Sequence, residues 1–124
     1  MTALLDTHAL LWWLTDDRRL SRRARETIAN DDILVSVVSA WEIEIKRGLG
    51  RLDADTHAIL DEVTGTEGFA WLEIGPAHVA ALVDLPALHR DPFDRMLVAQ
   101  AQLEHVALVS RDRGLRGYQV ETIW

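Results

Sequence analysis

Two acidic side chains follow short apolar segments closely enough to stand at the ends of strands. Asp6 comes directly after Ala3-Leu4-Leu5, and Asp112 comes three residues after Val106–Val109. Short apolar runs of this kind are typical of strands buried in a parallel sheet. Ligands of such sheets bind outside the carboxyl ends of the strands, so Asp6 and Asp112 are candidates for one shared site.

Two further acids lie in the first turns of expected helices. Glu42 follows the β-branched run Ile33–Val38 by one helical turn, and Asp94 lies one turn into a later helix. If the sheet is parallel, Glu42 shares the edge at which Asp6 lies. A helix that leads into a strand is expected to start at the opposite edge, so Asp94 joins the others only if the segment 85–92 carries the chain back across the sheet.

Carboxylates that converge in one cleft indicate a metal site. Like charges repel each other at short range, and burying them without a cation is costly in free energy. Divalent ions that prefer oxygen ligands are the usual solution, and Mg²⁺ typically takes only one or two carboxylates directly. A zinc site built on thiolates is excluded, because the chain contains no cysteine.

The same acids also have structural interpretations, and for any one acid taken alone a structural role is the more common one. Asp6 could cap the helix that follows it, and Asp112 could cap a turn. Ser39 and Glu42 match a capping box, and Glu42 could also pair with Lys46 one turn later. The joint pattern of four acids is what favours chemistry.

The elements that must position these acids alternate between strand and helix patterns. Besides the first strand, the segments with strand character are 33–38, 69–74, 106–109 and 118–123. The apolar stripes with helical spacing contain Leu20, Ala24 and Ile28; Trp41, Ile45 and Leu49; and Phe93, Met96, Leu97 and Ala101. Asp91-Pro92 is typical of a helix start with Asp94 in its acidic first turn, and Pro76 could open another helix. This alternation predicts an α/β domain with a mostly parallel sheet.

Length and composition narrow the class of protein. The chain has 124 residues, a formal net charge of −7 and 48% hydrophobic residues, as expected for one globular domain over 1–124. An acidic total charge argues against a general nucleic-acid coat but not against an enzyme with clustered basic groups. No apolar run approaches the ~20 residues that cross a membrane, and no secretory signal is recognised. With no cysteine, we expect a cytoplasmic protein.

Four segments together resemble the PIN-domain nucleases, and most of all the VapC-type toxins of bacterial toxin–antitoxin pairs. The segments are Leu4–Trp12 (LLDTHALLW), Ser39–Ile43 (SAWEI), Asp91–Leu97 (DPFDRML) and Ser110–Asp112 (SRD). Each segment alone is weak, but the four occur in the right order and at about the right spacing. The resemblance runs over nearly the whole chain, with no departure at the four acids.

The resemblance implies a fold, an active site and an activity. The fold would be a three-layer α/β/α sandwich around a parallel sheet of about five strands. The active site would be formed by Asp6, Glu42, Asp94 and Asp112 around Mg²⁺ or Mn²⁺, which also places Asp94 in the cleft. Asp6 and Asp94 are expected to bind the metal directly, and Glu42 and Asp112 to complete the site directly or through water. The activity would be cleavage of RNA by two-metal chemistry that leaves 5′-phosphate and 3′-hydroxyl ends.

Other residues have predicted roles in contacts with RNA or with a partner protein. Those that could contact RNA are Lys46, Arg95, Arg111, Arg113, Ser39 and Ser110. Five arginines within Arg18–Arg25 could do the same, or could form a solvated helix face. The resemblance also implies a small inhibitory antitoxin and a homodimer, with no membrane. Trp12 and Trp13 cannot share one helix face, so whichever is exposed is a candidate for the antitoxin interface.

Other functions remain open at the level of sequence. A PIN-like module could bind RNA without cutting it, and a PIN nuclease could process RNA without being a toxin. Phosphoryl transfer through an aspartyl phosphate is disfavoured, because one such class needs a lysine after a late strand and another needs an aspartate where His8 stands. His8 and His89 lie near acidic motifs and could be ligands or bases, but their spacing is not typical of zinc sites. We therefore predict a metal-dependent endoribonuclease that is the toxin of a toxin–antitoxin pair.

Overall fold

Five strands form one parallel sheet in the computed structural model, which describes residues 1–124. The strands are β1 (Thr2–Leu5), β2 (Asp32–Ser36), β3 (Phe69–Leu72), β4 (Ala107–Val109) and β5 (Thr122–Ile123). Their order is β3-β2-β1-β4-β5, and every neighbouring pair is parallel. The winding direction reverses between β1 and β4, which is where ligands bind in such sheets. The predicted parallel sheet of about five strands is confirmed.

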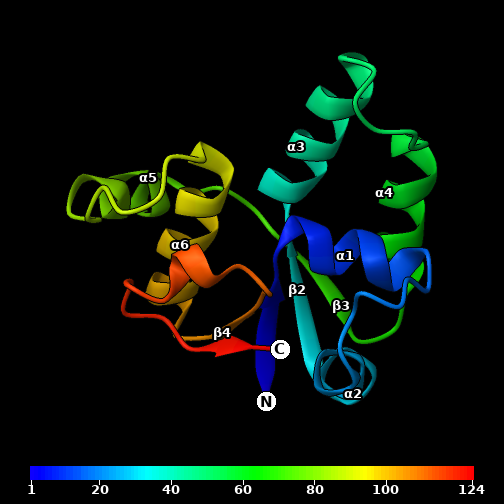
Figure 1. Ribbon diagram of the computed structural model, residues 1–124, viewed down its shortest axis with the longest axis horizontal. Helices are drawn as coiled ribbons and strands as arrows, with labels where there is room; N and C mark the ends of the chain where they lie inside the picture. Colours follow the sequence, from blue (N-terminus) through cyan, green and yellow to red (C-terminus); the bar gives the residue numbers. More distant parts are fainter.

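Helices cover both faces of this sheet (Figure 1). They are α1 (Thr7–Leu14), α2 (Arg22–Asn30), α3 (Val37–Gly48), α4 (Thr56–Gly65), α5 (Pro76–Val83) and α6 (Pro92–Glu104), with a 3₁₀ turn η1 (Arg113–Leu115). Successive residues of β1 point to opposite faces. Ala3 and Leu5 belong to a core shared with α1, α2 and α4, and Leu4 belongs to a second core built largely from α6. This arrangement is the predicted three-layer α/β/α sandwich.

None of these helices combines the length and the apolar character that crossing a membrane requires.

The second strand ends earlier than its β-branched run predicts. The side chain of Ser36 accepts a hydrogen bond from the N–H of Val38 and caps α3. The predicted strand over 33–38 and the predicted capping box of Ser39 with Glu42 are therefore wrong at this boundary. The cap satisfies an orphan N–H group of the first turn, and the two valines that follow enter the helix. Ser39 and Glu42 then lie one turn apart, and both are buried.

The remaining boundaries follow local signals to different degrees. Pro76 and Pro92 occupy the first helical positions of α5 and α6, as predicted. β3 and β5 are shorter than the predicted segments 69–74 and 118–123. The sequence patterns above do not predict α4 at all, because only Val63 of its residues is buried and its apolar stripe is correspondingly weak.

The direction of α6 decides where Asp94 lies. This helix begins beside the carboxyl ends of the strands and ends at Glu104, from where His105, with φ of 56°, turns the chain toward the amino end of β4. The expectation that the helix starts at the opposite edge is wrong, because a helix that connects parallel strands runs antiparallel to them. Asp94 therefore lies at the same edge of the sheet as Asp6.

Candidate active site

Three of the four acids line one hollow at the carboxyl edge of the sheet. Asp6 comes from the end of β1, Asp94 from the first turn of α6, and Asp112 from the loop after β4. The hollow has a volume of about 240 Å³ and is lined by Asp6, His8, Trp12, Asp94, Arg111 and Asp112. Glu42 in α3 lies close enough for its charge to raise the pKa of Asp94. The structure thus brings the four predicted acids together.

Asp6 is held by the helix that follows it. Its backbone is extended, and its carboxylate accepts a hydrogen bond of 2.8 Å from the N–H of Ala9, which makes it the N-cap of α1. The residue is 6% exposed, and burial raises its pKa, while hydrogen bonds from Ser110 and Ala9 act in the opposite direction. The capping role and the place in the hollow therefore belong to the same side chain.

Glu42 is buried but well satisfied. Its Oε1 accepts a hydrogen bond of 2.6 Å from the hydroxyl of Thr7, and its Oε2 lies 2.6 Å from Nζ of Lys46. The hydroxyl of Thr7 also lies 3.1 Å from Oγ of Ser39. The predicted pairing with Lys46 is present. Because Thr7 follows Asp6 directly, these contacts fix the start of α1 against the first turns of α3.

Asp94 shows that negative charge is crowded here. Burial, the largest cause, and the charges of the nearby acids Asp91, Glu42 and Asp6 together raise the pKa of Asp94 to about 7, against an opposing effect of His89. Burial and neighbouring acids thus let this carboxyl group keep its proton near neutral pH. A cation bound beside it would favour the charged form.

Asp112 is oriented from two sides. Its Oδ1 accepts a hydrogen bond of 2.8 Å from the N–H of Gly114, and Nε2 of His89 lies 2.8 Å from its Oδ2. Burial alone would raise the pKa of Asp112, but these two hydrogen bonds together with the nearby histidines His89 and His8 lower it. The N–H of Asp112 donates to Oγ of Ser110, and the same serine acts to lower the pKa of Asp6, so Ser110 influences both acids.

The donor atoms suit a divalent cation that prefers oxygen. Ligand atoms of His89, Asp94 and Asp112 all lie within 4.8 Å of one another, and Asp6 lines the same hollow. Carboxylate oxygens are the ligands of Mg²⁺ and Mn²⁺, and the pKa of Asp94 is raised by burial and by the neighbouring acids. The residues present therefore fit a divalent metal.

Two of the predicted RNA contacts lie beside the acids. Arg111 is exposed and lines the same hollow, with its guanidinium 4.6 Å from the centre of the Trp12 ring. Lys46 lines a neighbouring hollow of about 590 Å³, and His8 lines both. Arg113 is exposed in η1 and lines neither.

The other predicted RNA contacts have internal partners. Arg95 donates to the main-chain oxygens of Leu85 and Pro86, so its guanidinium holds the segment before α6. Ser39 and Ser110 are buried, where their hydroxyls bond the network around the acids. These three side chains therefore support the site from behind.

The arginine cluster at 18–25 is largely paired with nearby acids. The ion pairs are Arg19 with Asp17, Arg22 with Glu26, and Arg25 with Asp16. Figure 1 places α2 near the amino ends of the strands, away from the acid edge. This placement favours the interpretation as a solvated face.

The tryptophans differ from expectation. Trp12 and Trp13 take different faces of α1, but neither is fully exposed, since Trp12 is 7% exposed and Trp13 is half-buried. His8 stacks on Trp12 with ring centres 5.3 Å apart. The exposed tryptophan is Trp41 at 58%, which contacts Phe93 edge-on.

Two residues that the sequence did not single out hold the site together. Thr7 bonds Glu42, as described above. Gln100 is fully buried in α6, where its Oε1 accepts from the hydroxyl of Ser36 at 2.6 Å and its Nε2 donates to the carbonyl of Glu73. Gln100 thereby ties the start of α3 to α6. A polar residue within the apolar stripe of α6 is the signal that could have revealed it.

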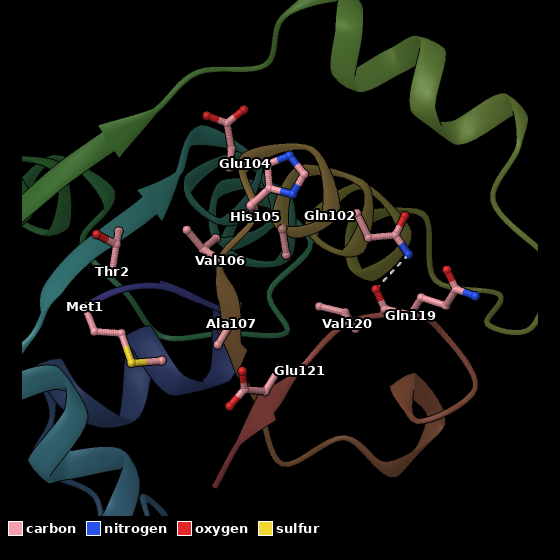
Figure 2. A pocket seen from close by; sticks show the side chains of 11 residues that line it. Met1, Thr2, Gln102, Glu104, His105, Val106, Ala107, Gln119, Val120 and Glu121 are labelled. Atoms are coloured by element: carbon pink, nitrogen blue, oxygen red, sulfur yellow. Dashed lines mark hydrogen bonds between the residues drawn. The ribbon is translucent and has the colours of Figure 1, made fainter.

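A larger hollow lies at the opposite edge of the sheet (Figure 2). It has a volume of about 540 Å³ and is lined by Met1, Thr2, the end of α6, the start of β4 and residues 119–121. Its ionisable side chains are Glu104, His105 and Glu121, and a hydrogen bond joins Gln102 to the carbonyl of Gln119. None of the four acids reaches it, so size alone does not identify the site.

Known proteins match this chain in sequence and in fold. A family model described as PIN domain matches residues 3–120. Ribonuclease VapC22 from Mycobacterium tuberculosis is 30% identical over 128 residues, which cover 99% of this chain and 98% of that protein.

Three solved structures share the fold. VapBC2 from Rickettsia felis, bound to a DNA fragment from their promoter, matches with a TM-score of 0.71 and 13% identity over 100% of both chains. FitAcB from Neisseria gonorrhoeae matches with a TM-score of 0.67 and 17% identity over 97% of this chain and 95% of that chain. A toxin–antitoxin complex from Klebsiella pneumoniae matches with a TM-score of 0.65 and 19% identity over 93% and 91%.

Proposed function

Because this chain belongs to the PIN-domain family and is a homologue of VapC-type ribonucleases, we propose that it is a metal-dependent endoribonuclease and the toxin of a toxin–antitoxin pair. Residues 1–124 would form one nuclease domain. The observation that carries the proposal is the convergence of Asp6, Glu42, Asp94 and Asp112 from four separate segments. Capping explains Asp6 and Asp112 one at a time, but it does not explain why carboxylates crowd around Asp94.

The four acids would have different roles in binding the metal. We assign direct metal binding to Asp6 and Asp94, with Glu42 and Asp112 completing the site directly or through water. Bound Mg²⁺ or Mn²⁺ would supply an activated water and stabilise the leaving oxygen of the RNA. Asp94 would release its proton as the cation binds, because a nearby positive charge favours the carboxylate. Lys46 would hold the carboxylate of Glu42 in place through their ion pair of 2.6 Å.

The RNA backbone would be held by the cations that flank the acids. Arg111 in the acid hollow and Lys46 in the neighbouring hollow are the supported contacts, and Arg113 is a further exposed cation one turn away. We no longer assign Arg95, Ser39 or Ser110 to RNA, because their hydrogen bonds are made inside the protein.

A partner protein would restrain the enzyme. An acidic hollow suits an arginine from an inhibitor, since a guanidinium can bridge two carboxylates and compete with a cation. We place the antitoxin contact on α1 near Trp13, because the burial of Trp12 makes it part of the core. A homodimer is proposed from the resemblance. Expression of this chain alone should slow bacterial growth, and co-expression of its antitoxin should restore it.

A cleavage assay with a labelled single-stranded RNA tests the activity. The wild-type protein should cut in Mg²⁺ or Mn²⁺, lose activity in chelator and regain it when metal is restored. Asp61→Asn, which changes an exposed acid on α4, should behave as the wild type and serves as the charge control. RNA binding by folded protein without metal-dependent cleavage would instead indicate a binding module. Cleavage without any effect on growth would leave a nuclease that is not a toxin.

A further inference from the structure

We propose that His89 is a positioning residue, which holds the carboxylate of Asp112 in place for the metal by donating its Nε2–H to Oδ2. His89 would therefore set the affinity of the site for metal without binding the metal itself. The proposal rests on the proposed function above, because it concerns the same metal site.

The hydrogen bonds of His89 define its tautomer. The backbone N–H of Asp91 donates to Nδ1 of His89 at 3.1 Å. Nδ1 therefore carries a lone pair, so the proton of the neutral ring is on Nε2. Nε2 lies 2.8 Å from Oδ2 of Asp112 and 3.5 Å from Oδ2 of Asp94. The ring thus presents a donor to these acids, and a metal ion could use Nε2 only if that proton left.

The imidazole is itself fixed by its surroundings. The N–H of His89 donates to the hydroxyl of Tyr118 at 2.9 Å, and the guanidinium of Arg95 reaches the same hydroxyl at 3.5 Å. Gly114 packs against the ring so closely that a Cβ there would lie 3.0 Å from Cδ2 of His89. His89 therefore presents its Nε2–H to Asp112 in a defined direction.

Asp112 needs such a support more than the other acids do. Its side chain is 38% exposed and stands at the start of a three-residue 3₁₀ turn. The N–H of Gly114 holds one carboxylate oxygen and His89 holds the other, and each oxygen keeps a lone pair that a cation could use. Without His89, the Oδ2 side of the carboxylate would be free to turn toward solvent. Partners that orient metal ligands in this way typically contribute 10–100-fold to metal affinity.

Metal titrations of the full chain test this role. The readout is the concentration of Mg²⁺ or Mn²⁺ that gives half of the metal-induced rise in melting temperature, measured without RNA. His89→Ala should raise this concentration about 10–100-fold. His89→Gln, which keeps an N–H donor at similar reach, should restore most of the affinity. His57→Ala, which removes an exposed histidine on α4, should leave it unchanged. At saturating metal, cleavage by His89→Ala should return to within a few-fold of wild type.

A double-mutant cycle separates positioning from direct binding. If His89 acts through Asp112, His89→Ala should have little further effect on metal affinity in an Asp112→Asn background. Nitrogen-15 spectra of the ring should show the Nε2–H tautomer both with and without Mg²⁺. Additive losses, failure of His89→Gln to restore affinity, or loss of the Nε2 proton on adding Mg²⁺ would overturn the proposal and make His89 a ligand. Unchanged metal affinity in a less stable His89→Ala would overturn it in favour of a purely structural role.

The proposed function is tested by the wild-type protein, and the role of His89 is tested by its variants. If the wild-type protein showed no metal-induced rise in melting temperature, both proposals would fall before any variant was made. If the wild type responds to metal and the His89 variants match it, only the assignment of His89 falls.

Discussion

The two halves of the acidic site are built in different ways. Asp6 and Glu42, which we call the inner pair, are 6% and 4% exposed, and each accepts a hydrogen bond from a residue within four positions along the chain. Asp94 and Asp112, the outer pair, are only partly buried and lie beside His89, which comes from the loop before α6. The inner pair is thus buried, whereas the outer pair is more exposed and shares a contact with His89.

The four acids should therefore differ in how strongly their substitution affects the metal site. The inner pair has its orientation fixed by the caps and helices that the chain must form to fold. The outer pair contains both the carboxyl group with the pKa raised to about 7, Asp94, and the one whose pKa is lowered, Asp112. Changes at Asp112 and at His89 beside it should therefore tune metal affinity, while changes at Asp6 and Asp94, the proposed direct ligands, should abolish activity.

The largest expected effect is the loss of cleavage when Asp6 is replaced, compared with a smaller loss when Asp112 is replaced. Asp6→Asn should lower cleavage by about 10³-fold, because a direct ligand carries several kcal/mol of metal chemistry. Asp112→Asn should cost about 10–100-fold, as expected for a residue that completes the site. Steady-state cleavage at saturating Mg²⁺ measures both. Equal losses for the two variants would remove the distinction, and full activity of folded Asp6→Asn would remove Asp6 from the site.

The next effect is a pH dependence of stability to which Asp94 contributes. In metal-free protein the pKa of Asp94 is about 7, against an ordinary value of 3.8 for an aspartate side chain. The folded state holds this proton more tightly than the unfolded chain, so the contribution to stability is fully present below the lower value and is lost as the pH rises toward 7. The loss amounts to at most about 4 kcal/mol.

Asp94→Asn cannot ionise, so it should be more stable than the wild type at pH 8 in chelator and should lose this advantage near pH 4. Urea unfolding at the two pH values measures the difference. An advantage of the same size at both would show that it comes from packing and not from the charge of Asp94.

The smallest effect is a loss of stability when Lys46, the cation paired with Glu42, is replaced. Lys46→Met should lower the free energy of unfolding by about 1–3 kcal/mol, because it leaves buried Glu42 without its charged partner. Arg47→Met on the same helix breaks an exposed pair with Glu44 and should cost less than about 1 kcal/mol. Thermal melts in chelator compare the two. Equal losses of stability in the two variants would show that the ion pair of Glu42 contributes no more than an exposed pair does.

The inner pair was the more predictable half of the site. Asp6 and Glu42 are satisfied by residues close in sequence or on adjoining helices, so capping and pairing rules identified two of their partners, the Asp6 cap and Lys46. The alternation of short apolar runs with helical stripes likewise predicted the parallel sheet, because parallel strands are buried on both faces. The cap at Ser36 was missed, since a β-branched run does not show where a strand gives way to a helix.

The local roles of Asp94 and Asp112 were predicted, but the contacts around the outer pair depended on information that no local pattern holds. The contact of His89 with Asp112 spans 23 residues, and the use of Arg95 to hold main-chain carbonyls depends on where the segment 85–91 folds. The direction of α6 was also misjudged, although the antiparallel course of helices between parallel strands would have placed Asp94 correctly. Long-range polar contacts of this kind become visible only when the tertiary structure is known.

If the inner and outer pairs hold one metal centre, anomalous scattering from crystals grown with Mn²⁺ should locate the ion between them. We expect a peak in the hollow between Asp6 and Asp94, with carboxylate oxygens of both as ligands and Asp112 within reach directly or through water. Asp94→Asn crystals treated in the same way should show a weakened peak or none. A peak elsewhere on the molecule, or an empty hollow at a Mn²⁺ concentration that supports cleavage, would contradict the claim.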